Sequence, residues 1–301
     1  MSSNSAARET IGFVGAGLMG HGIAANLLAG GYPLTVVGHR NRGPIDDLVG
    51  RGAREAASVA EMAAGCSVIF LCLTDARAVE AVVGEMDGVV KRGAVIVDCS
   101  TSDPVVTTRL AERLAARGVD YCDAPVGGTP DQAEAGQLQA MVGANPEVFS
   151  RLQPVLETWT ARIVHVGRVG DGHRMKLLNN LIALGYGALY AEALAVARKS
   201  GLTVQQVDQV IRGGRMDCGF YRTFMGYALE GNHEAHKFTL QNAYKDMRYV
   251  GAMADAAGCA NPLTSAIKNS YAMAVGTGGD GQEDYVPELV DYVARANGVA
   301  D

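Results

Sequence analysis

The chain has 301 residues, of which 48% are hydrophobic and 19% are charged, and its formal net charge at pH 7 is −6. This length predicts one large or two medium domains, and the composition excludes a disordered chain. The negative charge argues against a nucleic-acid partner, and no cluster of lysine and arginine suggests a membrane surface. The first ten residues lack the apolar segment of a signal peptide, so we expect a cytoplasmic protein.

The spacing of cysteine and histidine predicts no metal site. The six cysteines form no CxxC pair, and the stretch HEAH at residues 233–236 is not an HExxH motif. Three of the cysteines fall in apolar runs, where a free cysteine behaves as a small buried side chain. We therefore expect reduced, structural cysteines and no bound metal.

The first strong signal is a glycine-rich turn, GAGLMG, between an apolar strand over residues 10–14 and a helical segment that ends at Gly30. A second strand follows over residues 33–37. Glycines in this GxGxxG pattern let the backbone turn tightly and approach a pyrophosphate at the helix N-terminus. The expected cofactor contacts in this turn are Gly15, Gly17, Leu18, Met19 and Gly20.

The residues after the second strand select the cofactor. An acidic residue there would bind the adenosine ribose of NAD. This chain instead has His39, Arg40 and Asn41, with no acid before Asp46. Arginine suits the 2′-phosphate of NADP by charge and by stacking on adenine. We expect these three residues to bind NADP in preference to NAD; the alternative is a solvated basic loop beside loosely bound NAD.

Strands and helices alternate as far as residue 166. Further strands are expected at 67–73, 94–98, 119–123, 139–142 and 163–166, with helices between them. Such units predict a parallel, doubly wound sheet that binds its ligand at the carboxyl ends of the strands. Leu73 and Thr74, like Ser100 and Thr101, follow strand ends, so we expect them at the site. The dinucleotide-binding domain should cover residues 1–167.

A second glycine-rich loop, DAPVGGT, follows the strand that ends at Asp123. Backbone N–H groups at Gly127, Gly128 and Thr129 can hold a carboxylate-like anion. An ordinary glycine loop is the alternative, and this stretch alone does not decide between them.

From residue 168 to residue 301 the chain predicts a helical domain. It begins with a long helix over residues 170–199, which Asp171 could cap. The fifteen residues from Leu177 to Ala191 carry no charge, and at ~1.5 Å each they are too few to cross a ~30 Å hydrocarbon core. We therefore expect a helix buried among others. Further helices are expected near 203–212, 219–229, 240–257, 262–275 and 286–296, with a flexible loop over 276–281.

Lys176 stands at the start of the apolar run, with Asn179 and Asn180 one turn later on the same face. Apolar surroundings lower the pKa of a lysine, which suits a general acid/base, and a nearby amide can hold a substrate hydroxyl. The alternative is a lysine whose stem covers apolar surface. Lys245, beside Asp246 in a later helix, could reach the cofactor or form an ion pair on a solvated face.

Together these segments resemble one family, the β-hydroxyacid dehydrogenases of the 3-hydroxyisobutyrate and tartronate-semialdehyde reductase type, over nearly the whole chain. The resemblance rests on GFVGAGLMGHGIAANLLAGGY, DCSTSDP, DAPVGGTPDQAEAGQL, GDGHRMKLLNN and KFTLQNAYKD, in that order. It implies a Rossmann domain and an all-α domain like that of 6-phosphogluconate dehydrogenase, assembled as a homodimer or homotetramer. It also implies a general acid/base at Lys176 and substrate contacts from Asn180 and the second glycine loop.

Two positions depart from the family loop PVSGG, because Gly127 replaces the serine and Thr129 replaces a glycine. PVGGT together with Arg174 is similar to the sulfolactaldehyde reductase branch. The arginine of that branch's PVGRT loop is nevertheless Gly128 here. The acid group of the substrate, a carboxylate or a sulfonate, therefore stays open.

We expect an NADP-preferring oxidoreductase that interconverts a small 3-hydroxy acid and its semialdehyde, with Lys176 and Asn180 as catalytic residues. Substrate contacts are expected from Ser100, Thr101, Gly127, Gly128, Thr129, Arg174 and Asn179. Thr101 should also border the nicotinamide, and further cofactor contacts are expected from Leu73, Thr74 and Lys245. The enzyme alternatives are a sulfolactaldehyde reductase and an imine reductase on the same scaffold. A non-catalytic NADP-binding regulator is the alternative of another class.

Overall fold

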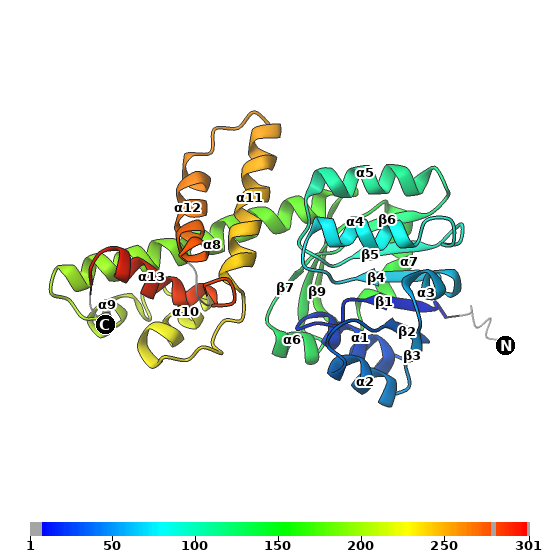
Figure 1. Ribbon diagram of the computed structural model, residues 1–301, viewed down its shortest axis with the longest axis horizontal. Coiled ribbons are helices and arrows are strands. Elements are labelled where there is room, and N and C mark those ends of the chain that lie inside the picture. The colour runs from blue at the N-terminus through cyan, green and yellow to red at the C-terminus, as the bar shows by residue number, and fades with distance from the viewer. Residues whose placement is uncertain (1–7, 278–280, 300–301) are drawn as a thin grey trace. The chain divides into compact units, whose positions relative to one another are not determined.

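The computed structural model describes residues 8–277 and 281–299. It divides into two compact units, Met1–Lys176 and Leu177–Asp301, so the boundary lies within helix α8 (Asp171–Lys199). The boundary expected from the sequence lies earlier, after Gly167. The first unit combines a sheet with helices, and the second is built from helices (Figure 1). The predicted fold class, a Rossmann sheet followed by an all-α domain, is confirmed.

The sheet of the first unit has the order β3-β2-β1-β4-β5-β6-β8-β7, with β9 paired to β8. From β3 to β6 all strands are parallel, in the 3-2-1-4-5-6 order of dinucleotide-binding sheets. The strands are β1 (Ile11–Val14), β2 (Leu34–Val37), β3 (Arg54–Ala56), β4 (Val68–Leu71), β5 (Val95–Asp98), β6 (Asp120–Asp123), β7 (Val126–Gly127), β8 (Leu138–Gly143) and β9 (Thr160–Gly167).

Beyond β6 the sheet departs from the parallel expectation, because β8 is antiparallel to both β6 and β7. The sequence does not predict β3 or β7. Their three and two residues are too few to show a period of alternating side chains.

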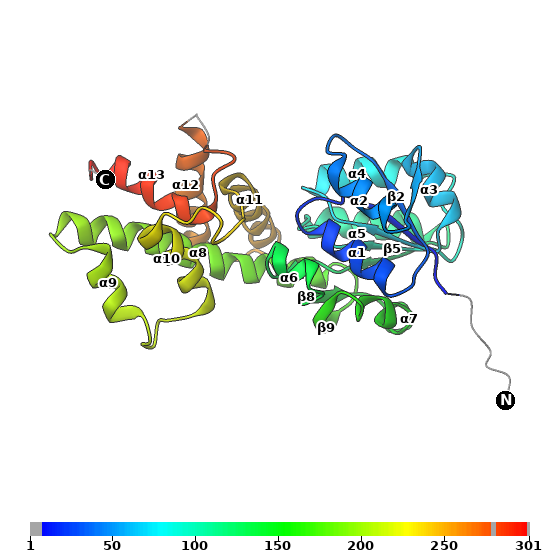
Figure 2. The same cartoon turned by 90° about the horizontal axis from the view of Figure 1, so that it is seen from below.

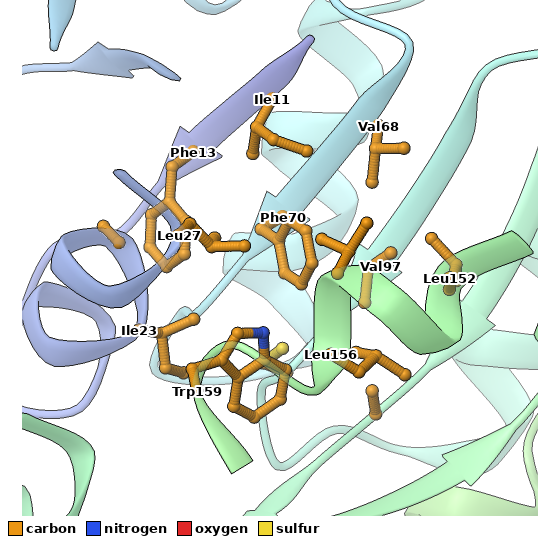
Figure 3. Close-up of a cluster of buried hydrophobic side chains, with 14 of the residues drawn as sticks. Ile11, Phe13, Ile23, Leu27, Val68, Phe70, Val97, Leu152, Leu156 and Trp159 are labelled. Atoms are coloured by element: carbon orange, nitrogen blue, oxygen red, sulfur yellow. The ribbon is translucent and has the colours of Figure 1, made fainter. Parts of the chain in front are cut away.

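Helices cover both faces of the sheet, and each face has its own apolar core (Figure 2). One face carries α1 (Gly20–Ala29), α2 (Gly43–Gly50) and α7 (Pro146–Leu156), and the other carries α3 (Val59–Gly65), α4 (Ala76–Glu85) and α5 (Pro104–Ala115). Successive strand side chains point to opposite faces, so Phe70 enters one core while Ile69 enters the other. Phe70 stacks on Phe13 at 6.1 Å and meets Trp159 edge-on at 6.3 Å (Figure 3).

The second unit consists of the rest of α8 and the helices predicted after it. These are α9 (Val204–Ile211), α10 (Gly219–Glu230), α11 (Leu240–Ala256), α12 (Pro262–Gly276), the short η1 (Val286–Glu288) and α13 (Leu289–Ala296). Tyr190 of α8 packs edge-on against Tyr221 and Phe224 of α10 within the shared core. The loop expected over 276–281 lies in part outside the described residues.

Within this chain helix α8 is buried on one side only, although the sequence predicts a helix buried among others. Its exposed apolar side chains are Met175, Leu178, Ile182, Tyr186, Leu189 and Val196. By length and composition α8 could also cross a membrane, with a mean hydropathy of 1.4. Half of the most apolar 18-residue stretch of α8 is buried inside the fold, as in the core helix of a globular protein.

Candidate active site

The three glycines of the GxGxxG turn have three different surroundings. Gly15 has φ +98°, and a Cβ there would lie 2.2 Å from the carbonyl oxygen of Cys72. A Cβ on Gly20 would lie 2.0 Å from the carbonyl oxygen of Gly15, whereas one on Gly17 would meet nothing within 4 Å. The turn therefore needs Gly15 and Gly20 for its shape and leaves open space beside Gly17, where a pyrophosphate can approach.

The start of α1 suits an anion as well. No side-chain oxygen caps this helix at Met19, and Leu18 before it is 61% exposed. The first N–H groups of a helix carry partial positive charge and bind phosphate. The turn thus fits the pyrophosphate of a dinucleotide cofactor.

His39, Arg40 and Asn41 follow β2 as an exposed loop. Asn41 accepts a hydrogen bond from the N–H of Gly43 through Oδ1 (3.2 Å). Arg42, which the sequence analysis did not single out, forms ion pairs with Glu55 of β3 and Asp46 of α2. The structure thus separates the two arginines of this loop, because only Arg42 is held by nearby carboxylates.

His21 links the helices that follow these loops. Its Nδ1 lies 2.7 Å from Glu134 of α6 (Pro130–Glu134), and its Nε2 lies 2.9 Å from Asp47 of α2. Partial burial opposes protonation, but the hydrogen bonds to Glu134 and Asp47 raise the pKa of His21 overall. A protonated His21 can therefore tie α1 to both α2 and α6.

The loops after β4 and β5 leave the sheet side by side, since Leu71 pairs with Asp98 in the register. Ser100 is buried, and its Oγ accepts the N–H of Leu73 at 2.9 Å. Thr74 is exposed and Thr101 is partly buried at the same edge. The structure thus brings Leu73, Thr74, Ser100 and Thr101 to one edge of the sheet, where Ser100 joins the two loops.

A buried polar cluster, which the sequence analysis missed, fixes the start of α8. Asp123 accepts hydrogen bonds from the N–H groups of Gly170 (2.6 Å) and His173 (2.8 Å). Burial raises the pKa of Asp123. The expectation that Asp171 caps this helix is wrong, because its carboxylate accepts the N–H of Arg168, which precedes the helix.

His173 completes this cluster. Its Nδ1 lies 2.8 Å from Oγ1 of Thr107, and its Nε2 lies 3.0 Å from the carbonyl oxygen of Ser100. A carbonyl oxygen only accepts, so Nε2 carries a proton. The first turn of α8 is thereby anchored to the loop after β5. The sequence signal for this cluster is that β5 and β6 both end in aspartate and that the stretch GDGH follows at the start of α8.

The second glycine loop is built around local hydrogen bonds. Thr129 caps α6, accepting the N–H of Gln132 while its own N–H donates to the Gln132 side chain. Gly128 has φ +134°, and a Cβ there would lie 2.7 Å from Leu138. This conformation therefore strains any side chain at position 128. Gly127, in β7, leaves ordinary van der Waals distance to Met141.

Asn180, one turn after the partly buried Lys176, has a fixed amide. Asn180 is 6% exposed, and its Nδ2 donates to Oδ2 of the fully buried Asp246 at 2.6 Å. Because a carboxylate only accepts, the NH₂ group of Asn180 must face Asp246, which leaves Oδ1 to accept from other donors. Lys245 lies 3.3 Å from the other oxygen of Asp246. The sequence analysis considered Asp246 only as an ion-pair partner of Lys245 on a solvated face, whereas Asp246 is fully buried.

The remaining predicted substrate residues lie beside this pair on α8. Asn179 is exposed, with its Nδ2 3.4 Å from Oδ1 of Asn180. Arg174 forms an ion pair with Asp171 at 2.6 Å. No group of three or more metal-ligating side chains occurs within 8–277 and 281–299. All six cysteines are unpaired, and Cys259 is the exposed one.

Comparison with known proteins places this architecture in a family. The model of the NAD binding domain of 6-phosphogluconate dehydrogenase matches residues 10–167, and that of the NAD-binding of NADP-dependent 3-hydroxyisobutyrate dehydrogenase matches 170–288. The 2-(hydroxymethyl)glutarate dehydrogenase of Eubacterium barkeri is 39% identical over 204 residues, 67% of each chain. The 3-hydroxyisobutyrate dehydrogenase of Pseudomonas aeruginosa is 33% identical over 272 residues, 87% of this chain and 91% of that protein.

A solved structure shares the fold. The 3-hydroxyisobutyrate dehydrogenase of Mycobacterium tuberculosis with L-serine superposes with a TM-score of 0.84 at 24% identity, covering 95% of this chain and 99% of that one.

The sheet order and the glycine turn define an oxidoreductase that binds a nicotinamide dinucleotide. One family model covers more than half of the chain, and two relatives exceed 30% identity over two thirds of their length or more. The chain belongs to the β-hydroxyacid dehydrogenase family. As a member it is an NAD(P)-dependent 3-hydroxyacid dehydrogenase, and the predicted family, the enzyme class and the binding of NAD(P) are confirmed.

Proposed function

We propose that this enzyme interconverts a small 3-hydroxy acid and its semialdehyde, with NADP preferred over NAD and Lys176 as the general acid/base. The observation that carries this proposal is the fixed amide of Asn180, one turn after Lys176 and held by the buried Asp246. An amide oriented in this way presents an acceptor beside a proton donor, as alcohol–carbonyl chemistry requires.

The bound nicotinamide supplies or accepts the hydride at the substrate carbon. In the reducing direction the Lys176 ammonium gives a proton to the carbonyl oxygen as that carbon gains the hydride, so an alcohol forms. In the oxidising direction neutral Lys176 takes the hydroxyl proton. Oδ1 of Asn180 accepts a hydrogen bond from the hydroxyl or from the ammonium and so orients the transfer. Asp246 keeps Asn180 in this orientation.

The acid group of the substrate is proposed to bind a backbone N–H group of the second glycine loop at Gly127 or Gly128, because the N–H of Thr129 donates to the Gln132 side chain. A carboxylate is favoured over a sulfonate, because neither arginine feature of the sulfolactaldehyde branch is available in this structure. Position 128 strains any side chain, and Arg174 is paired with Asp171. An imine reductase or a non-catalytic NADP-binding regulator would not require Lys176, Asn180 and Asp246 to act together.

A panel assay tests this function. NADPH oxidation is followed with succinic, tartronic and sulfonated semialdehydes, with cyclic imines and without substrate. Turnover of a carboxylated semialdehyde well above the other compounds supports the proposal. Turnover of imines alone, or of nothing in the panel, contradicts it.

We further propose a homo-oligomer that covers the exposed face of α8. Ile182, Leu189 and Val196 recur every seven residues and are 60%, 57% and 60% exposed. A repeat of seven places side chains along one seam of a helix, where a second copy of the same helix can pack. Light scattering should show at least a dimer, and Leu189→Lys should shift it toward the monomer. A monomeric wild-type protein at micromolar concentration contradicts this proposal.

A further inference from the structure

An acidic side chain of strand β3, Glu55, lies at the carboxyl end of β2. In sheets of this order the ribose-binding acid stands at the end of the second strand, and here that position is Gly38. A Cβ built on Gly38 would lie 2.4 Å from Nη1 of Arg42 and 2.6 Å from Oε1 of Glu55. Glu55 belongs to β3, which pairs in parallel with β2 and places Glu55 opposite Val36. The ion pair of Glu55 with Arg42 therefore occupies the space that a side chain at position 38 would fill.

Arg42 fixes this carboxylate in place. Its Nη1 and Nη2 donate to the two oxygens of Glu55 at 2.5 and 3.0 Å, and Nη2 also donates to Asp46 at 2.8 Å. The hydrogen bonds from Arg42 lower the pKa of Glu55, so the carboxylate is charged at neutral pH. A carboxylate has about four lone-pair sites, and two remain for another donor. The side chain of Glu55 is 34% exposed, so that donor can come from solvent or from a ligand.

We propose that Glu55 is a cofactor-specificity residue that accepts a hydrogen bond from the adenosine ribose 2′-hydroxyl of NAD(H) and disfavours the 2′-phosphate of NADP(H). The inference rests on the proposed cofactor loop of His39, Arg40 and Asn41, and it adds an opposing group to that loop. Glu55 places a fixed negative charge beside the two arginines of this loop, Arg40 and Arg42. Glu55 therefore lowers the ratio of NADP to NAD affinity that Arg40 alone would give, so the enzyme can still use NAD.

Glu55→Gln tests this role, because it keeps the size of the side chain and removes its charge. Isothermal titration of the full chain measures binding of NADPH and NADH, and of the fragments 2′,5′-ADP and 5′-ADP, which carry no nicotinamide. A hydrogen bond to a charged group corresponds to roughly a ten- to hundredfold difference in affinity. The ratio of NADPH to NADH affinity should rise by about tenfold or more, through weaker NADH and tighter NADPH, and the fragments should follow the same order.

Asp46→Asn is the matched control. It also removes one negative charge and one hydrogen bond to Arg42, but Asp46 is 64% exposed on α2. Its affinity ratio should change by less than about threefold, as expected for a screened surface charge. Equal shifts in Glu55→Gln and Asp46→Asn would overturn the proposal, because they would reflect net charge alone. Unchanged NADH and 5′-ADP affinities in Glu55→Gln would also overturn it.

The result is separable from the NADP preference itself. That preference is read from the wild-type affinity ratio and from Arg40→Ala, whereas the role of Glu55 is read from the change between wild type and Glu55→Gln. A wild-type protein that favours NADH would refute the preference and leave the effect of Glu55 measurable.

Discussion

The cofactor turn after β1 and the first turns of α8 serve one reaction in the proposed mechanism, but they are built in opposite ways. The turn binds through backbone groups, and its side chains matter chiefly where glycine is required, at Gly15 and Gly20. The start of α8 depends on side chains, because Asp123 and Asp246 come from distant parts of the chain to hold the helix and its amide, and His173 of α8 binds the loop after β5. Cofactor affinity and proton transfer should therefore fail independently when single residues are changed.

The largest effect is expected from Lys176→Ala. General acid–base groups contribute roughly 10²–10⁴-fold to turnover, so kcat should fall by that factor. NADPH affinity should stay within a few fold, because the glycine turn is unaltered. Stopped-flow turnover and calorimetric Kd are the measurements, with Lys199→Ala at the exposed end of α8 as control. A large loss of NADPH affinity in Lys176→Ala would contradict the proposal that cofactor affinity and proton transfer depend on different residues.

Arg40→Ala should produce the reverse pattern. Loss of a charge-assisted hydrogen bond to the 2′-phosphate should weaken NADPH about ten- to hundredfold and leave NADH almost unchanged. At saturating NADPH, kcat should be close to that of the wild type. Titration of both cofactors decides this, and Arg162→Ala, on the exposed side of β9, controls for a general charge effect. Equal weakening of the two cofactors would rule out a contact with the 2′-phosphate.

Asp246→Asn sharpens the comparison within the α8 site. The new amide can satisfy Asn180 in either orientation, so the amide of Asn180 is no longer fixed. We expect kcat to fall about tenfold, with little change in NADPH affinity. Asp255→Asn, an exposed change on the same helix, is the control. A variant with full kcat would show that Asp246 does not position Asn180.

The smallest effect concerns His21, which joins the cofactor turn to α2 and α6. Its folded-state pKa is raised above the value of 6.5 for a free histidine. The stabilisation is therefore fully present below about pH 6.5 and lost as pH rises through the raised pKa. It should be at most about 1 kcal/mol, because Asp47 and Glu134 are nearly half exposed. Urea unfolding should show His21→Gln destabilised at about pH 6 and closer to wild type at about pH 9. If the unfolding free energies of the two proteins differ by the same amount at every pH, protonated His21 does not stabilise the contacts with Asp47 and Glu134.

The contrast between the cofactor turn and the start of α8 also explains which features can be predicted from the sequence. The glycine turn is readable because its residues are consecutive and each glycine has a local cause. The parallel sheet is readable because buried strands such as VIFL stand between helical segments. The contacts of Asp246 and His173 cannot be read from the sequence, since their partners lie 66 and 73 residues away. Glu55 is hidden for a similar reason, because its place beside Gly38 depends on β3, a strand of three residues without a recognisable period.

The exposed face of α8 shows another limit. An uncharged run predicts burial, but it does not distinguish cover by the same chain from cover by another copy. Leu184 and Leu194 are buried in this chain, whereas Ile182 and Leu189 on the same helix are exposed.

The central claim is that Lys176 moves the proton, and Lys176→Arg tests it most directly. Arginine keeps the positive charge and the long stem, but its guanidinium does not release a proton near neutrality. We predict that kcat with a carboxylated semialdehyde falls at least about a hundredfold, while the Kd for NADPH stays within a few fold of the wild type. A Lys176→Arg enzyme with near wild-type kcat would contradict the claim and would assign this lysine a structural role.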